Sequence, residues 1–109
     1  MERFEYVRLV LEAYRSTPGV AGVVRSADRL LAAALFDRGV TLETVQNALV
    51  LAASRRMTRP EGAAPLGQVR SLAYFSPVID EVLESNVSRQ YFDYLRHRLG
   101  RASSRSSRQ

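Results

Sequence analysis

The chain has 109 residues, with eleven acidic and sixteen basic side chains, and all of the basic ones are arginine, which gives a net charge of +5. A hydrophobic content of 46% is typical of one globular domain, and the absence of cysteine excludes disulfides, a thiolate nucleophile and cysteine-based zinc sites. His97 is the single histidine, so the usual zinc site with four nitrogen or sulfur ligands is excluded too, and we expect no metal or cofactor.

The distribution of charge is more informative than its total. Residues 1–88 contain ten arginines and ten acidic residues, whereas residues 89–109 contain six arginines and only Asp93. A GC-rich genome also produces arginine in place of lysine, so arginine content alone means little. The segregation predicts a neutral body with a basic end.

The first predicted helix covers about residues 3–16, because apolar residues recur there at three-and-four spacing. Pro18, in the segment 16–19, ends it. The second helix begins with Ser26 as its cap, has Asp28 in its first turn, and stops at Gly39. The inward-facing residues of these two helices are expected to be Phe4, Val7, Leu11, Tyr14, Leu30, Leu31, Ala34 and Leu35.

A third helix follows at once, with Thr41 as its cap and an apolar stripe that includes Val45 and Leu49. The junction at Gly39 resembles a helix-turn-helix, in which Gln46 and Asn47 would project outward and could pair with adenine. The alternative is an ordinary antiparallel helix pair, which the apolar residues 49–53 favour.

Residues 58–67 contain two prolines and two glycines and are predicted to form an irregular loop, which either bears function or spans the fold. A short helix is expected at about 69–75. Ser76 and Pro77 then start another helix, Ser76 as the cap and Pro77 at the first position. The alternative is one helix that is continuous from residue 69 and kinked at Pro77.

The last predicted helix begins at Ser88, has Val87 and Phe92 as a hydrophobic staple, and stops at Gly100. Its buried stripe is expected to be Tyr91, Phe92, Leu95 and Leu99. Residues 101–109 have almost nothing apolar to bury and are predicted to be disordered in isolation. The sequence therefore predicts an all-α fold: a compact bundle of about five helices in a helical domain of residues 1–100, followed by a disordered Arg/Ser tail, 101–109.

Catalytic constellations are missing. Asp80, Glu81 and Glu84 are carboxylates on one short segment, and a solvated helix face explains them better than acid-base or magnesium chemistry. The segment 18–22 has two glycines but follows a helix, unlike a phosphate-binding loop. We expect no enzyme and no small-molecule substrate.

The basic end is the predicted binding element. Its arginines can neutralise phosphates of DNA or RNA without reading the sequence, and Tyr91 and Tyr94 lie near them for stacking. A solubilising tail is the alternative. Four arginines around the loop extend the surface only if the fold brings them beside the last helix. The predicted phosphate contacts are Arg89, Arg96, Arg98, Arg101, Arg105 and Arg108, together with Arg55, Arg56, Arg59 and Arg70.

The run from Val69 to Val82 resembles a stretch in small helical proteins of bacterial mobile elements. Together with residues 38–45 it resembles the C-terminal helical domain of DnaD-type replication initiation proteins, over residues 25–85. That resemblance implies DNA binding in replication, primosome loading or transposition, and matches Tyr74 to the family's tyrosine. The pair Tyr74 and Phe75, followed by Pro77, departs from the family's Tyr-Ile motif, and the family's upstream winged-helix domain is absent from this sequence.

Two further expectations complete the prediction. The apolar run 48–53 is far short of the ~20 residues that cross a bilayer. Residues 1–5 lack the order of a signal peptide. Together these observations predict a cytoplasmic location and no membrane partner. The alternative to nucleic-acid binding is a protein-interaction or assembly subunit of a larger nucleoprotein complex.

Overall fold

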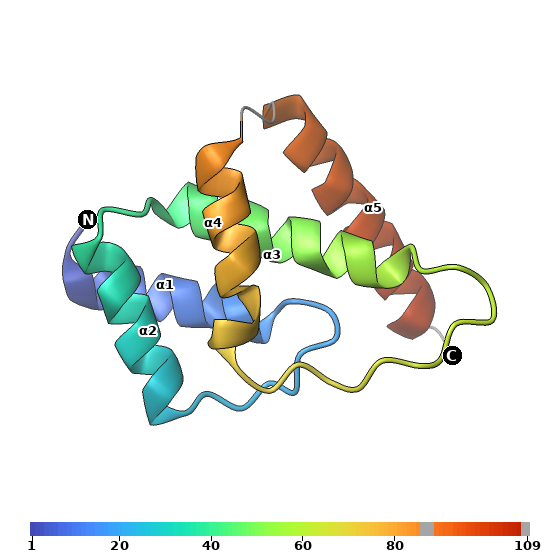
Figure 1. The fold of residues 1–109 in the computed structure, drawn as a ribbon, viewed down its shortest axis with the longest axis horizontal. Helices are drawn as coiled ribbons and strands as arrows, with labels where there is room; N and C mark the ends of the chain where they lie inside the picture. Colours follow the sequence, from blue (N-terminus) through green and yellow to red (C-terminus); the bar gives the residue numbers. More distant parts are fainter. Residues whose placement is uncertain (86–88, 108–109) are drawn as a thin grey trace.

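A computed structural model describes residues 1–85 and 89–107, and the side chains of all of these except 89–90 and 101–107. The described chain forms five α-helices and one 3-10 helix and contains no β-strand, which confirms the predicted all-α bundle (Figure 1). The elements are α1 (Arg3–Arg15), α2 (Ser26–Asp37), α3 (Leu42–Met57), η1 (Leu72–Phe75), α4 (Ser76–Glu84) and α5 (Arg89–Ser107).

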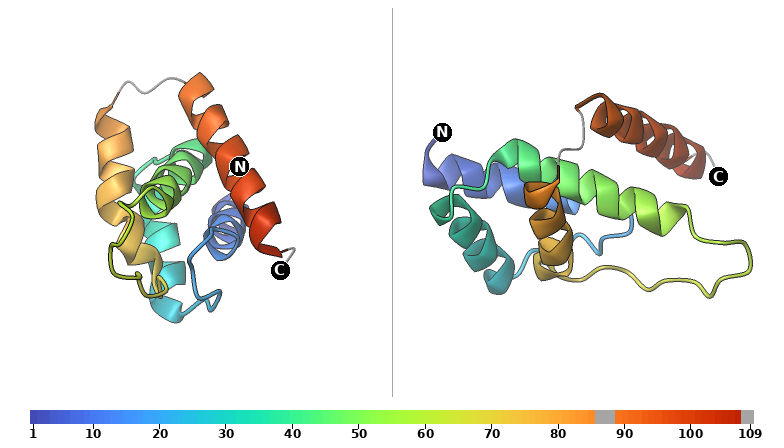
Figure 2. Two further views of the ribbon diagram at one scale, coloured as in Figure 1. Left: turned by 90° about the vertical axis from the view of Figure 1, so that its right-hand side faces the viewer. Right: turned by 45° about the horizontal axis from the view of Figure 1, so that its top comes forward.

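The helix α3 is the centre of the fold. It packs against α1, α4 and α5, and the views in Figure 2 show α4 and α5 on different sides of it. The largest fully buried side chains include Tyr14 and Phe75, whose rings meet edge to face at 6.1 Å. The main core joins α1, α2, α3, η1 and α4 through residues that include Val10, Leu35, Val45, Leu49, Leu72 and Ile79. Because apolar positions of α3 point in several directions, this helix is covered on most of its circumference.

The turn between α2 and α3 is confirmed at Gly39. Its φ of +79° is left-handed, and its N–H donates to Phe36 O at 2.9 Å while the next N–H, of Val40, donates to Leu35 O at 3.0 Å. These are the two hydrogen bonds of a Schellman motif, which satisfies carbonyls at the end of α2. The Tyr6 hydroxyl donates to Val40 O at 2.7 Å, so α1 holds this turn in place, and burial raises the pKa of Tyr6.

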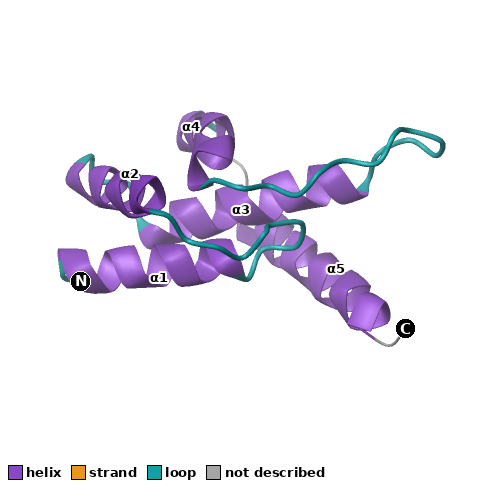
Figure 3. Ribbon diagram, turned by 90° about the horizontal axis from the view of Figure 1, so that it is seen from below, coloured by secondary structure: helices purple, strands orange, loops and turns teal. Residues whose placement is uncertain are grey.

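The expectation that the helices on either side of Gly39 form an antiparallel pair is wrong. The buried face of α2 packs on α1 and η1 instead of along α3 (Figure 3). That face runs through Asp28, Ala32 and Leu35, so Leu30 lies on the other side of the helix and is 71% exposed. Phe4 is 81% exposed because α1 buries Tyr6, Val10 and Tyr14.

Asp28 begins α2 in a way that the sequence did not suggest. Ser26 is the first helical residue and does not cap the helix; the Asp28 carboxylate accepts from the Arg25 N–H at 2.9 Å. Its other oxygen accepts from the Leu72 N–H, also at 2.9 Å, and Asp28 is only 2% exposed. One buried carboxylate therefore ties the start of α2 to the start of η1.

The irregular loop after α3 is confirmed, and it returns along the segment that follows α1. Val69 forms a parallel bridge with Val20, with Val69 N–H donating to Gly19 O at 2.8 Å. This extended pairing delays the expected short helix until Leu72. In α4, Ser76 is the first helical residue and makes no side-chain cap, and Pro77 takes the second position.

The last helix is attached through a second, smaller cluster, in which Phe92 and Leu95 pack on Leu51 of α3. The expected stop at Gly100 is wrong: Gly100 has no positive φ, and α5 continues to Ser107, with its C-terminal end projecting from the core (Figure 3). Arginine, alanine and serine at 101–107 present no steric bar to helical angles, and a helical glycine costs only ~1 kcal/mol relative to alanine. The predicted cap and staple at 87–88 lie outside the described residues. Disorder of the tail in isolation stays a prediction.

Candidate nucleic-acid interface

An exposed row of aromatic and cationic residues follows one face of α5. Tyr91 is 45% and Tyr94 is 56% exposed, so the prediction that Tyr91 is buried is wrong. The Arg98 guanidinium lies over the Tyr94 ring, 5.9 Å from its centroid. Positions 101 and 105 continue the three-and-four spacing of these residues along the helix. We call residues 91, 94, 98, 101 and 105 the α5 stripe.

Residues 91, 94 and 98 of the stripe are exposed because neighbouring positions anchor the helix. Phe92, Leu95 and Leu99 are buried, and their direction on α5 sets the direction of the stripe. A tyrosine ring held with half its surface in water, beside a guanidinium, offers a flat face for a base and a charge for a phosphate. Among the described side chains, this is where predicted stacking and phosphate-binding residues of the last helix meet.

Arg96 does not belong to the stripe. It is partly buried and donates to the Asn47 side-chain oxygen of α3 and, at 3.0 Å, to Asp93. Gln46 lines a cavity of about 280 Å³ between the end of α1, α3 and α5, together with Leu99. Both predicted base-reading residues thus lie beside α5, and the two-bond pairing of Asn47 with adenine would require Arg96 to release the Asn47 side-chain oxygen.

The arginines that flank the loop are used within the fold. Arg55 of α3 donates to both carboxylate oxygens of Glu81 in α4, at 2.7 and 2.5 Å, and these hydrogen bonds hold the pKa of Glu81 below its usual value. Arg56 donates to Gly67 O at 2.6 Å and to the Tyr74 hydroxyl at 3.1 Å, and lies over the Tyr74 ring.

The remaining arginines of this group differ in their engagement. Arg59 donates to the Ala64 carbonyl, whereas Arg70 is exposed with no hydrogen bond or ion pair to a described residue. Arg56 and Arg59 therefore brace the loop beside α3, whereas Arg55 is directed to α4. Arg55 nevertheless interacts electrostatically with Tyr91 of the α5 stripe, so of these three arginines it is the one beside the last helix.

The other predicted arginines are placed only in part. Positions 89, 101 and 105 belong to α5, but their side chains lie outside the described part of the chain, as does the whole of Arg108. Their roles as phosphate contacts remain predictions.

Four ion pairs between described residues lie within the neutral body, residues 1–88, and a fifth lies within α5. Five described arginines are bound to carboxylates, and these pairs are largely exposed except at Arg96, which is partly buried. The pairs are Arg3 with Asp37, Arg8 with Glu12, Arg38 with Asp80, Arg55 with Glu81 and Arg96 with Asp93.

Two of the three carboxylates of α4 are therefore engaged. Asp80 binds Arg38 at 3.4 Å and Glu81 binds Arg55, which joins α4 to the α2–α3 turn and to α3. Over the described residues, no three histidine or carboxylate side chains gather as metal ligands would, and no helix has the length and apolar character to cross a membrane.

Comparison with known proteins returns no relative. No family model matches the chain, and no curated protein and no solved structure matches it.

Proposed function

We propose that the protein is a non-catalytic, cytoplasmic nucleic-acid-binding accessory protein. It uses the α5 stripe and Arg108 after it to hold the phosphate backbone of DNA or RNA without reading its sequence. The observation that carries the proposal is the coincidence of exposed tyrosines with the charge surplus on one helix. Residues 89–109 have six arginines against Asp93, and the one described carboxylate of that segment is bound to Arg96.

The direction of the stripe supports stacking. Tyr91 and Tyr94 lie one helical turn apart, and base-aromatic stacking stabilises single-stranded complexes by about 1–3 kcal/mol per base whatever the base is. Arginines at a spacing of three and four residues beyond them would follow the backbone, which contributes affinity but little specificity. A single-stranded segment suits this combination best.

The biological setting follows from the resemblance given above. A DnaD-type helical domain or a small helical protein of a mobile element would use such binding during replication or transposition. Tyr74, the residue matched to the family's tyrosine, is 47% exposed but accepts a hydrogen bond from Arg56, so it braces the loop. We therefore assign binding to α5 and not to Tyr74.

The test is fluorescence anisotropy of labelled 20-nucleotide single-stranded DNA, RNA and duplex DNA with the full chain, across salt concentrations. R101Q/R105Q removes two charges from the stripe, and R3Q/R38Q removes two arginines that are paired with Asp37 and Asp80. We expect the first variant to bind more weakly and to reduce the salt slope by about 1.4 on a single strand, since each lost phosphate contact changes it by ~0.7.

Two further comparisons complete this test. Y91A/Y94A should weaken single-strand binding while leaving the salt slope unchanged, because stacking releases no counterions. Deletion of residues 101–109 should behave as R101Q/R105Q does, only more strongly. A loss of affinity on deletion without a change in salt slope would contradict the proposal.

A second candidate function is an assembly subunit of a nucleoprotein complex, and exposed apolar side chains favour it. Phe4 is 81%, Leu30 71% and Val23 60% exposed. Large apolar side chains that lie exposed in the free chain would be buried against a partner if they belong to an interface. Analytical ultracentrifugation separates the two candidates: a monomer with no affinity for any polynucleotide supports a hetero-partner, whereas a monomer that binds single strands supports the first proposal.

A further inference from the structure

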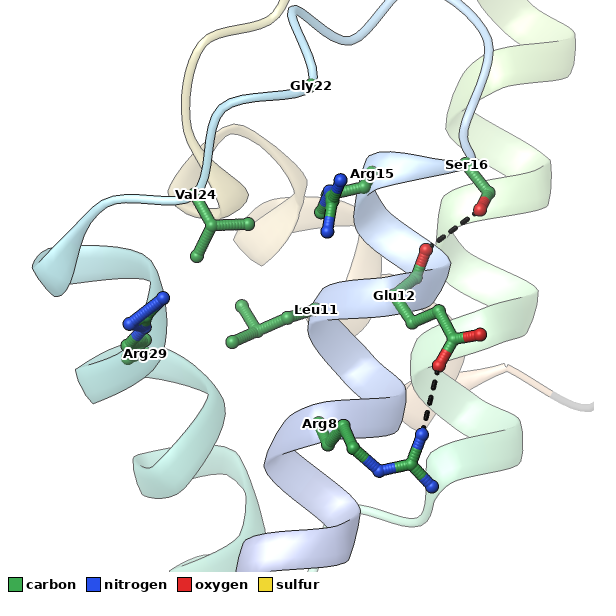
Figure 4. Close-up of a pocket in the computed structure, with 8 residues that line it drawn as sticks. All are labelled: Arg8, Leu11, Glu12, Arg15, Ser16, Gly22, Val24 and Arg29. Atoms are coloured by element: carbon green, nitrogen blue, oxygen red, sulfur yellow. Dashed lines mark hydrogen bonds and ion pairs between the residues drawn. The ribbon is translucent and has the colours of Figure 1, made fainter.

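A groove of about 630 Å³ lies between α1 and α2, beside the loop that joins them (Figure 4). Arg8 and Arg15 line it from α1 and Arg29 lines it from α2, while Leu11 and Val24 form its apolar part. We propose that this groove binds one sugar-phosphate unit, of a nucleic-acid strand or of a free nucleotide, with the phosphoryl group between Arg15 and Arg29.

The charged side chains that line the groove favour the binding of an anion. Three arginines line it with one carboxylate, Glu12, and that carboxylate is already bound to Arg8 at 3.2 Å. Arg15 and Arg29 are exposed and have no described carboxylate within ion-pair distance. Figure 4 shows them on opposite sides of Leu11 and Val24. A phosphoryl group placed between them would be neutralised from two helices.

The chemistry of the two side chains suits an oxyanion such as phosphate. A guanidinium is planar and donates two parallel hydrogen bonds to phosphate oxygens, and it stays charged at any physiological pH. Arg15 stands near the end of α1 and Arg29 in the first turn of α2, so the backbone of each helix fixes the position from which each arginine reaches.

The volume and the lining residues of the groove indicate a ligand larger than a lone phosphate ion. Its volume falls within the roughly 300–1,000 Å³ of ligand sites, which leaves room for a sugar beside the phosphoryl group. Leu11, 9% exposed, and Val24 present carbon surface against which a sugar ring can pack. Gly22 lies at the rim of the groove and has a φ of +85°. No atom beyond the two adjacent residues lies within 4 Å of the position that a Cβ would occupy at Gly22, so this side of the groove is open.

The groove is distinct from the α5 stripe, because it is built from α1, α2 and their connection, and the two can be altered separately. R15Q/R29Q removes the two groove arginines that have no described carboxylate partner. R3Q/R38Q is the matched control, since it lowers the net charge by the same amount through arginines that already have carboxylate partners. Y91A/Y94A removes the two tyrosines of the α5 stripe and leaves the groove unchanged, so it tests the contribution of the stripe to binding.

The experiment titrates the full chain and these variants with 12-nucleotide single-stranded DNA, with adenosine monophosphate and with inorganic phosphate. Binding is followed by anisotropy or calorimetry, and the backbone and arginine Nε–H resonances are followed by NMR. We expect shifts at Arg15 and Arg29, at least tenfold weaker binding of the occupying probe in R15Q/R29Q, and less than a threefold change in R3Q/R38Q.

The probes identify the source of the sugar-phosphate. If the resonances of the groove residues shift with the oligonucleotide alone, the ligand is a nucleic-acid strand. If they shift with adenosine monophosphate as well, the ligand is a free nucleotide. Inorganic phosphate that binds as tightly as adenosine monophosphate overturns the sugar-phosphate assignment, because the sugar then contributes nothing.

The outcomes also separate this inference from the proposed function. Oligonucleotide binding that Y91A/Y94A abolishes, without shifts in the groove, overturns the groove and leaves the stripe. Groove shifts that persist in Y91A/Y94A at unchanged affinity support the groove and overturn the stripe. A chain that binds none of the three probes overturns both.

Discussion

Replacement of Asp28 by alanine tests how the helical body is held together. Asp28 is 2% exposed, and its two carboxylate oxygens accept from the Arg25 and Leu72 N–H groups at 2.9 Å each. The substitution removes both bonds and leaves the buried Leu72 N–H without an acceptor. It therefore releases the start of α2 and the start of η1 from each other.

The magnitude follows from these two bonds. A hydrogen bond to a charged group stabilises a protein by about 1.5–3 kcal/mol, so D28A should lower the free energy of unfolding by ~3–5 kcal/mol. Small domains have only about 5–15 kcal/mol in total. At roughly 4–8 °C per kcal/mol, a loss of about 4 kcal/mol lowers Tm by about 15–30 °C. D28N retains one accepting oxygen and should lose about half as much.

Urea unfolding followed by circular dichroism measures the effect, with D37A as the control. Asp37 also binds an arginine, Arg3 at 3.0 Å, but its side chain is 58% exposed, and a surface pair of this kind stabilises by only ~0–1 kcal/mol. Equal losses in D28A and D37A, or a D28A loss below about 1 kcal/mol, would refute the view that buried hydrogen bonding holds α2 to η1.

Three smaller predictions concern other contacts. Y6F should cost about 1 kcal/mol in a urea melt, because it removes a 2.7 Å buried hydrogen bond to a backbone carbonyl of the α2–α3 turn; an unchanged stability would contradict this. G39A should destabilise by ~1 kcal/mol and G100A should stabilise by ~0.5–1 kcal/mol, since of these two glycines only Gly39 has a positive φ; effects of the same sign would contradict it. The pKa of Glu81, lowered by Arg55, should return toward its usual value in R55Q when followed by NMR. Since that folded-state pKa is lowered, the contribution of the pair to stability is present at neutral pH and is lost as the pH falls through it.

Most helix positions follow from local signals. Three such features were predictable: the end of α2 at Gly39, the Thr41 cap of α3 and the irregular loop after α3. The Thr41 hydroxyl accepts from the Thr44 N–H at 3.1 Å. Each depends on the dihedral angles or hydrogen bonds of residues at most a few positions apart. Gly100 shows where such local signals fail to predict the end of a helix. A glycine can adopt the left-handed backbone conformation that ends a helix, but it can equally stay helical, as Gly100 does.

The candidate sites were predictable only in part. The charge surplus of residues 89–109 can be counted in the sequence, and it led to Arg98 and the tyrosines of α5. Arg15 and Arg29 were missed, because residues 1–88 are neutral in sum. That sum conceals where the ion pairs form. Four carboxylates of this segment bind other arginines, and Arg15 and Arg29 remain beside the groove.

The sequence by itself determined the all-α class, the neutral body and the basic end, since helix periodicity and formal charge are properties of the chain at short range. Only the tertiary structure decided which helices meet. An apolar stripe can pack against any other apolar stripe, so nothing in residues 26–37 specifies α1 as the partner of α2 instead of α3. For the same reason the bond from Asp28 to Leu72, which joins residues 44 positions apart, and the arginine-lined groove exist only once the chain is folded.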